Sequence, residues 1–216
     1  MPGKLTYFPL GIRAEPIRAV LHFAGQDYED ERIDATEQQA RKASGDLPLG
    51  SLPVWEEDGI QYAQSGSILR MLGIRNGYYT SDPNTAWEID SLIDFMEENF
   101  NDFVSLPAKP VFGATAGPED REKFDKYCDK VIPILEGRLA RHGKKYIAGT
   151  DNMTIADLKV YQSFGVLLWV DACPAPQDAK DACQAKIDAS PKLKVYIAQL
   201  KQDMQPWISA RVPTPL

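Results

Sequence analysis

The dipeptide Asp58-Gly59 constrains the fold more than any other feature of this 216-residue sequence. It separates two short segments, Val54-Trp55-Glu56-Glu57 and Ile60-Gln61-Tyr62-Ala63, whose composition is typical of strands. Asp-Gly supplies the positive φ angles that a type I′ turn requires, so the sequence predicts a tight antiparallel hairpin. Ser65 follows the second segment, and we expect its side chain to cap a helix that carries Ile68, Leu69 and Leu72.

The residues before this hairpin alternate between strand and helix patterns. Lys4–Phe8 reads as a strand, and Glu15-Pro16 opens an apolar helical pattern that ends at Gly25. Tyr28–Ile33 reads as a charged edge strand, and Glu37–Ala43 as a weak, polar helical turn. The predicted order is strand, helix, strand, helix, strand, strand, helix (βαβαββα). Residues 1–79 are therefore expected to form a small α/β domain.

Helical patterns fill the remainder of the chain. Tyr79–Asn84 is a polar connector that contains a proline, and we place the domain boundary there. Residues 84–216 are expected to form an all-helical domain. Long helices are expected at Trp87–Phe103, at Glu119–His142 with a kink at Pro133, after the capping-box spacing of Thr154 and Asp157, and from Pro191.

Charge and composition exclude several classes of function. The chain has 24 basic and 31 acidic residues, and its net charge of −7 disfavours a nucleic-acid partner. The three cysteines form no Cys-x-x-Cys pair and the two histidines lie far apart, so we expect neither a metal site nor a Ser-His-Asp relay. The longest apolar run, Phe164–Val170, is far shorter than the roughly 20 residues of a membrane span. No export signal is recognised, and we expect a cytosolic protein.

Candidate site residues gather at the strand ends of the first domain, where α/β sheets usually bind ligands. They are Tyr7 at the end of the first strand, Leu52-Pro53 before the hairpin, and Gln64-Ser65 at the start of the following helix. The free N–H groups of a helix start favour a carboxylate or phosphate. Each feature alone is more often structural, and only their joint occurrence in this order indicates a binding site.

Further segments extend this combination to a family signature. In the first domain they are Leu5-Thr6-Tyr7-Phe8, Arg13-Ala14-Glu15, Ile17-Arg18, Leu52-Pro53-Val54 and Gln64-Ser65. In the second they are Asp90–Met96, Ala156-Asp157 and Trp207–Arg211. Together they resemble cytosolic glutathione S-transferases of the tyrosine type, most of all the sigma class. The resemblance implies a thioredoxin-like N-terminal domain, an all-helical C-terminal domain, a homodimer, glutathione as co-substrate and a cis peptide bond before Pro53.

The same resemblance implies roles for individual residues. Tyr7 would donate a hydrogen bond to the glutathione sulfur, and Arg13 would place a positive charge near it. The remaining glutathione contacts would come from Lys42, from the backbone of Leu52 ahead of Pro53, from Gln64 and Ser65, and from Asp94 of the partner subunit. The hydrophobic second substrate would lie against Phe8, Leu10, Met96 and Phe100.

The chain also departs from the family pattern. Gln38 or Gln39 stands about where the family carries a tryptophan, and Leu49 stands where some classes carry an aromatic residue of the dimer interface. Gly45-Asp46 look inserted, which affects the register of Lys42. Ile93 replaces one of the acids of prostaglandin-isomerising sigma enzymes.

The implied chemistry needs a thiolate, because a free thiol with a pKa of about 8.5 is only a few per cent ionised at neutral pH. Lowering that pKa by about two units corresponds to roughly 2.7 kcal/mol, and a charge-assisted hydrogen bond of about 1.5–3 kcal/mol supplies much of it. The function expected first is conjugation of glutathione to small hydrophobic electrophiles in detoxification. The alternatives are a glutathione-dependent isomerase of a lipid peroxide and a non-catalytic, crystallin-like carrier protein.

Overall fold

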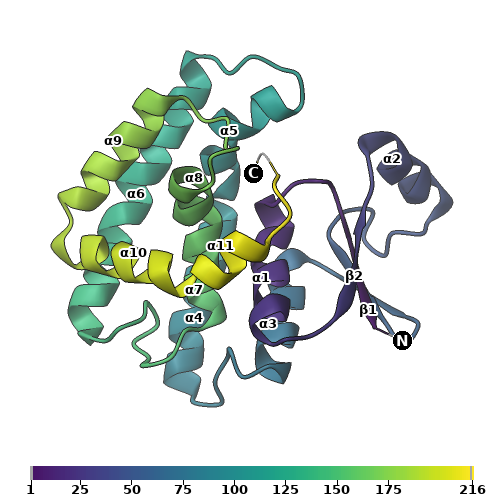
Figure 1. The fold of residues 1–216 in the computed structure, drawn as a ribbon, viewed down its shortest axis with the longest axis horizontal. Coiled ribbons are helices and arrows are strands. Elements are labelled where there is room, and N and C mark those ends of the chain that lie inside the picture. The colour runs from purple at the N-terminus through teal and green to yellow at the C-terminus, as the bar shows by residue number, and fades with distance from the viewer. Residues whose placement is uncertain (1, 215) are drawn as a thin grey trace. The chain divides into compact units, whose positions relative to one another are not determined.

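A computed structural model describes residues 2–214 and 216. Contacts within the chain divide it into two compact units, Met1–Tyr79 and Thr80–Leu216, and each unit is described by itself. The first contains a sheet and three α-helices, and the second is built from helices (Figure 1).

The first unit is organised by a four-stranded mixed sheet. Its strands are β1 (Gly3–Tyr7), β2 (Tyr28–Arg32), β3 (Val54–Glu57) and β4 (Ile60–Ala63), in the spatial order β2-β1-β3-β4. β1 runs parallel to β2 and antiparallel to β3, and β3 and β4 form the hairpin. The predicted hairpin residues, the charged edge strand and the βαβαββα order are confirmed. Asp58 and Gly59 both have positive φ, as the turn requires.

Two helices cover one face of this sheet. They are α1 (Glu15–Phe23) and α3 (Ser65–Arg75), which pack against each other (Figure 1). Successive strand residues point to opposite faces, so Leu5 and Tyr7 share a face and Thr6 points the other way. All three side chains are buried, and on the opposite face the Thr6 hydroxyl donates a hydrogen bond to Glu31. A proline at the start of α1 and Gly25 after its end set the limits expected from the sequence.

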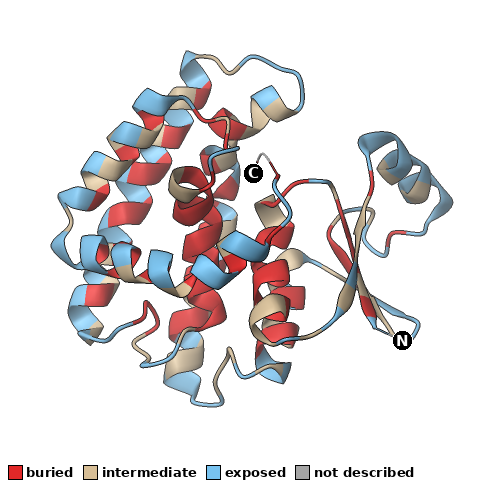
Figure 2. Ribbon diagram, viewed as in Figure 1, coloured by how far each residue is buried: buried red, intermediate tan, exposed pale blue. Residues whose placement is uncertain are grey.

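The remaining helix of this unit, α2 (Ala35–Ser44), has no buried residue and is almost entirely exposed in Figure 2. The prediction of a weak turn at Glu37–Ala43 was wrong in extent, because two caps stabilise a full ten-residue helix. Asp34 accepts a hydrogen bond from the backbone N–H of Glu37, and Gly45 ends the helix with a φ of 83°. Both ends are therefore fixed by local chemistry rather than by burial.

The second unit is helical throughout its regular elements. These are α4 (Pro83–Glu98), α5 (Phe100–Val111), α6 (Pro118–His142), α7 (Ile155–Val160), a π-helical segment (Tyr161–Gly165), α8 (Val166–Trp169), α9 (Gln177–Asp188), α10 (Pro191–Asp203) and α11 (Gln205–Ala210). The single helix predicted at Trp87–Phe103 is wrong, since the chain breaks at Asn99, whose side-chain amide donates to the Phe95 carbonyl at 2.7 Å. α9 was not predicted, and α10, predicted as the last helix, is followed by α11.

An aspartate organises the core of this second unit. Asp157 is fully buried, and it accepts hydrogen bonds from the backbone of Ile147 and Thr154, from the Thr154 hydroxyl, and from the Tyr196 hydroxyl at 2.8 Å. The predicted capping box of Thr154 and Asp157 is thereby confirmed. Among the described residues no helix has both the length and the apolar character that crossing a bilayer requires.

Candidate functional site

Sheet register brings three of the predicted site residues to one edge of the first unit. The β1–β3 ladder pairs Thr6 with Val54, and the β3–β4 ladder pairs Val54 with Ala63. Continuing both ladders by one residue places Tyr7 beside Pro53 and Pro53 beside Gln64. Neighbouring strands lie about 5 Å apart, so Tyr7, Pro53 and Gln64 form one row. We call this row the site edge.

Tyr7 is a buried member of the site edge, with 4% of its surface exposed. Burial raises the pKa of its phenol above the ordinary value of 10.0. A hydrogen bond from the backbone N–H of Arg13 and the positive charges of Arg13 and Arg18 act in the opposite direction. Because the net effect is upward, Tyr7 keeps its proton at neutral pH and is able to donate a hydrogen bond.

The turn after β1 carries Arg13 back to Tyr7. Arg13 lies in the short 3₁₀ helix Ile12–Ala14, which leads directly into α1. Ile12 has a φ of 37°, a left-handed conformation that a β-branched residue rarely adopts. The Arg13 guanidinium is partly buried, which lowers its pKa, and the Tyr7 phenol partly opposes this effect. The predicted pair is therefore within electrostatic range in the structure.

The loop before β3 contributes the middle of the site edge. The Leu52–Pro53 peptide bond is cis, as the family resemblance implied. Pro53 is buried and Leu52 is half-buried. Val54, the next residue, enters β3, so the position of this loop is fixed by the sheet itself.

Gln64 and Ser65 form the last part of the site edge. Gln64 has φ 73° and ψ 109°, which is unusual for a residue with a side chain, and such strain is concentrated at functional sites. Ser65 was expected to cap α3, but Gln64 occupies the N-cap position and no side chain makes a capping hydrogen bond. The first hydrogen bond of α3 runs from the Ile68 N–H to the Gln64 carbonyl. The N–H groups before Ile68 have no partner within the helix. This helix start can therefore bind a carboxylate.

Lys42 extends from α2 toward the loop that carries Leu52. Its side chain is exposed, and its Cε lies 3.5 Å from where a Cβ at Gly50 would stand. The residues that looked inserted are the ones that end α2, because Gly45 is its C-cap. The ammonium group therefore lies on the side of α2 that faces the loop.

The other predicted site residues occupy less accessible or separate positions. Phe8 is half-buried, and Leu10 is 4% exposed. In the second unit Asp94 is exposed on α4, whereas Met96 and Phe100 are 1% and 2% exposed. The last two side chains therefore belong to the core of the helical unit.

Sequence reasoning gave no role to Arg18, which the structure places directly under Tyr7. This residue is 1% exposed, and its guanidinium carbon lies 5.9 Å from the centroid of the Tyr7 ring. A charged residue within the apolar pattern of α1 was the available signal, because an arginine is rarely buried without a specific partner.

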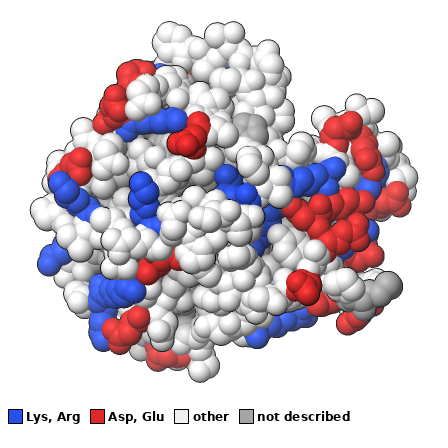
Figure 3. All heavy atoms as spheres, viewed as in Figure 1, with Lys and Arg blue, Asp and Glu red and all other residues white. Residues whose placement is uncertain are grey.

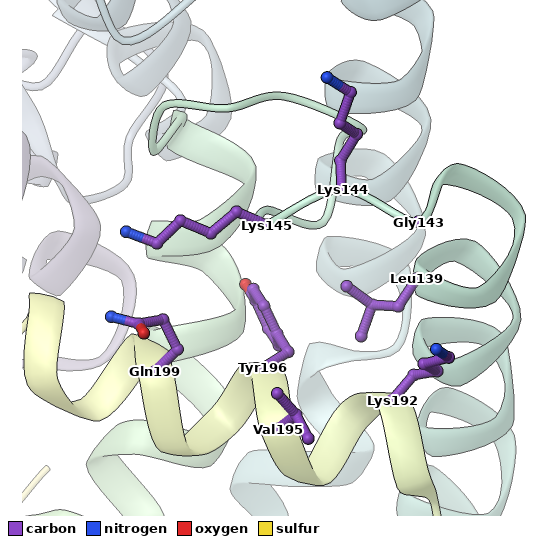
Figure 4. Close-up of a pocket in the computed structure, with 8 residues that line it drawn as sticks. All are labelled: Leu139, Gly143, Lys144, Lys145, Lys192, Val195, Tyr196 and Gln199. Carbon is purple, nitrogen blue, oxygen red and sulfur yellow. The ribbon is translucent and has the colours of Figure 1, made fainter.

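A cavity lined by three lysines does not form a competing site. It has a volume of about 300 Å³ and lies in the helical unit (Figure 4). The side-chain nitrogens of Lys144, Lys145 and Lys192 point away from one another, and the Tyr196 hydroxyl already donates to Asp157. Among the described residues no group of three or more His, Cys, Asp or Glu could hold a metal ion. On the face shown in Figure 3, acidic side chains gather where β2 and α2 lie, which disfavours a polyanionic partner there.

Comparison with known proteins identifies the family. Glutathione S-transferase 1 of Ascaris suum is 33% identical over 221 residues, which cover 98% of each chain. The chain belongs to the glutathione S-transferase family. A probable glutathione S-transferase 6 of Caenorhabditis elegans is 31% identical over 90% of this chain and 95% of its own length.

Two further results agree with membership of the glutathione S-transferase family. The family profile described as "Glutathione S-transferase, C-terminal domain" matches residues 101–200, in the helical unit. The crystal structure of monomeric Na-GST-3, a glutathione S-transferase of the hookworm Necator americanus, superposes with a TM-score of 0.82. It is 26% identical and covers 100% of both chains. The fold is therefore the thioredoxin-like domain followed by a helical domain that the sequence predicted.

Proposed function

We propose that this member of the family activates the thiol of glutathione at the site edge and conjugates it to small hydrophobic electrophiles. The observation that carries this proposal is the pairing of the Tyr7 hydroxyl with Arg13 beside Pro53 and Gln64. Reaction with an aryl chloride forms a carbon–sulfur bond and breaks the carbon–chlorine bond. Chloride leaves, and the thiol proton passes to solvent.

Tyr7 would act as a hydrogen-bond donor rather than as a base. Its pKa lies above 10.0 because of burial, so the phenol retains its proton throughout the neutral range. A hydrogen bond donated to sulfur favours the charged form of the thiol. The Arg13 charge, partly withdrawn from water, would favour the same form.

The remaining site residues would hold the peptide part of glutathione. The start of α3, with Gln64 and Ser65, is suited to the γ-glutamyl carboxylate. The half-buried backbone of Leu52 would pair with the cysteinyl amide, and the ammonium of Lys42 would bind the glycine carboxylate. Asp94 would reach the amino group of glutathione bound to a second copy of the chain.

We also propose a homodimer of sigma-class type that works in the cytosol. Support comes from Asp94, which is exposed on α4, and from large apolar side chains that are more than half exposed, namely Leu49, Ile60 and Trp87. Phe8, which is half-buried, remains a proposed contact of the second substrate, whereas Leu10, Met96 and Phe100 are at most 4% exposed and are not proposed as its wall. The isomerase alternative is the less favoured one, since Ile93 stands where prostaglandin-isomerising sigma enzymes carry an acid. A measurement of mass in solution tests the dimer.

Retention on immobilised glutathione, followed by a conjugation assay with 1-chloro-2,4-dinitrobenzene, tests the function. We expect both binding and turnover. Ser65→Ala should weaken glutathione binding by about fivefold to tenfold, since one hydrogen bond contributes about 1 kcal/mol. Ser67→Ala, two residues further along the same helix, is the matched control and should bind normally. Binding without turnover would support a carrier protein instead, and absence of both would refute the proposal.

A further inference from the structure

Arg18 is a buried charge beside the Tyr7 ring that has no assigned role. It lies on α1, and its side chain enters the space below the Tyr7 ring. Burying a guanidinium is costly unless charges and hydrogen-bond acceptors compensate it. The groups that compensate Arg18 therefore show what the residue is used for.

Two groups bind the Arg18 side chain, and they lie on different segments. Its Nε donates to Asp30 of β2 at 3.0 Å, and its Nη1 donates to the backbone carbonyl of Leu10 at 2.6 Å. Nη2 is buried and has no hydrogen-bond partner among the described residues. Arg18 thus connects α1, β2 and the turn that follows β1.

The bond to Leu10 bears directly on the geometry of the site edge. Leu10 follows Tyr7 by three residues and is itself fixed by a hydrogen bond from its N–H to the Phe8 carbonyl. The same turn continues to Ile12, with its left-handed backbone, and to Arg13, whose N–H bonds to the Tyr7 oxygen. A strained conformation persists only where the surrounding structure holds it in place. Arg18 supplies one such restraint from inside the unit.

Arg18 shares its carboxylate partner with a second arginine. Asp30 is shared with Arg32, whose Nε and Nη2 lie 2.8 Å and 2.7 Å from the other carboxylate oxygen. Two guanidinium groups therefore share this carboxylate, and Glu15, a second buried carboxylate, acts on the Tyr28 phenol from α1. Within this unit Arg13 and Arg18 are the charged groups that act on the Tyr7 phenol, and Asp30, Arg32 and Tyr28 surround the far side of the cluster.

We infer that Arg18 is a positioning residue for glutathione activation: it fixes the turn that aims Tyr7 and Arg13 at the thiol. This inference rests on the proposed function, because it assigns Arg18 to the same thiol. Arg18 touches neither glutathione nor the electrophile in this account. It acts through Tyr7 and through the Leu10 carbonyl.

The test is the pH profile of full-length Arg18→Met. Loss of the restraint should weaken the hydrogen bond from Tyr7 to sulfur and raise the apparent pKa of the bound thiol by about one unit. We therefore expect kcat/KM for the aryl chloride to fall about tenfold at pH 6.5 and to approach the unaltered value near pH 9. A purely structural role predicts an equal loss at every pH.

Arg32→Met is the matched control, because it removes the other guanidinium bound to Asp30 and keeps the hydrogen bond from Arg18 to the Leu10 carbonyl. Its profile should remain unchanged, and Arg18→Lys, which keeps the charge, should shift by less than Arg18→Met. If Arg18→Met does not fold, the test compares Arg18→Lys with Arg32→Met. We then expect a smaller rise in the apparent pKa of the bound thiol in Arg18→Lys and no rise in Arg32→Met. Equal shifts in the arginine variants, or no shift at Arg18, would overturn the inference. If the unaltered protein does not lower the pKa of the bound glutathione thiol, the proposed function itself is refuted.

Discussion

Replacing Tyr7 by phenylalanine removes one oxygen and keeps the ring. The ring packs edge-to-face against Phe8 at 5.4 Å and is almost wholly buried, so the variant preserves the shape of the site. What it loses is the proposed hydrogen bond to sulfur. A hydrogen bond to a charged group contributes about 1.5–3 kcal/mol, which corresponds to about one to two pKa units of the bound thiol.

The sign of the effect determines where it is visible. A thiol whose pKa is lowered in the complex is ionised above that lowered value, whereas an unassisted thiol is ionised only above about 8.5. The two proteins should differ most between these limits. At pH 6.5 we expect Tyr7→Phe to lose about 10-fold to 100-fold in kcat/KM and most of the ultraviolet absorbance of bound thiolate. Near pH 9 the two should converge.

Tyr28→Phe is the control for this experiment. Tyr28 belongs to the same sheet, its ring lies 6.2 Å from that of Trp55, and burial with the nearby Asp30 raises its pKa to about 12. It has no proposed contact with glutathione and should leave the thiolate signal unchanged. Thermal unfolding completes the comparison, because loss of the Tyr7 oxygen leaves the Arg13 N–H without that acceptor. Full thiolate absorbance at pH 6.5 in Tyr7→Phe would refute the reasoning.

Three further changes have predictable results. Gln64→Gly should raise the free energy of unfolding by about 1 kcal/mol, because glycine adopts the φ of 73° without strain, and should weaken glutathione binding. Gln64→Ala should weaken glutathione binding without the gain in stability. A glycine variant less stable than the unaltered protein would show that Gln64 is not strained. Glu31→Gln should lower the free energy of unfolding by about 1 kcal/mol at pH 7, a screened value for a partly exposed group, because hydrogen bonds from Arg41 and Thr6 hold the pKa of Glu31 down at about 2. This contribution is present above about pH 4.3 and disappears as the pH falls toward 2, so urea titrations of both proteins should converge in acid. Asp157→Ala leaves four buried donors without their acceptor and should destabilise the helical unit by at least about 3 kcal/mol, and a loss below about 1 kcal/mol in chemical unfolding would contradict that role.

Local chemistry made the first unit predictable from the sequence. The hairpin was predicted to the residue, because Asp58-Gly59 determines both the turn and the pairing of the strands. The same strand pairing explains why Tyr7, Pro53 and Gln64 lie in one row, since each lies at the end of a strand of the sheet or within one residue of it. The role of Arg18 was not predictable, because it depends on the hydrogen bond from α1 to the Leu10 carbonyl. The periodicity of the sequence does not indicate such a contact.

The helical unit was less predictable because apolar spacing alone does not show where a helix ends. The pattern of Phe95, Met96, Phe100 and Phe103 continues at helical spacing across the break at Asn99. At the break, the Asn99 side chain donates a hydrogen bond to the Phe95 carbonyl and accepts one from Lys130 of α6. α9 escaped prediction because its buried face is formed by the small residues Ala179 and Cys183 with Ile187, which give only a weak pattern.

The Asp58-Gly59 turn controls the proposed chemistry although it lies at the opposite end of the hairpin. Shortening this connection by one residue would slide β4 along β3 and bring Ser65, rather than Gln64, level with Pro53. The same slip would exchange the inward and outward sides of β4. The length of this turn therefore determines which residue at the start of α3 lies beside Pro53. A natural change in its length is expected to be harmless only when Val54 still pairs with Ala63.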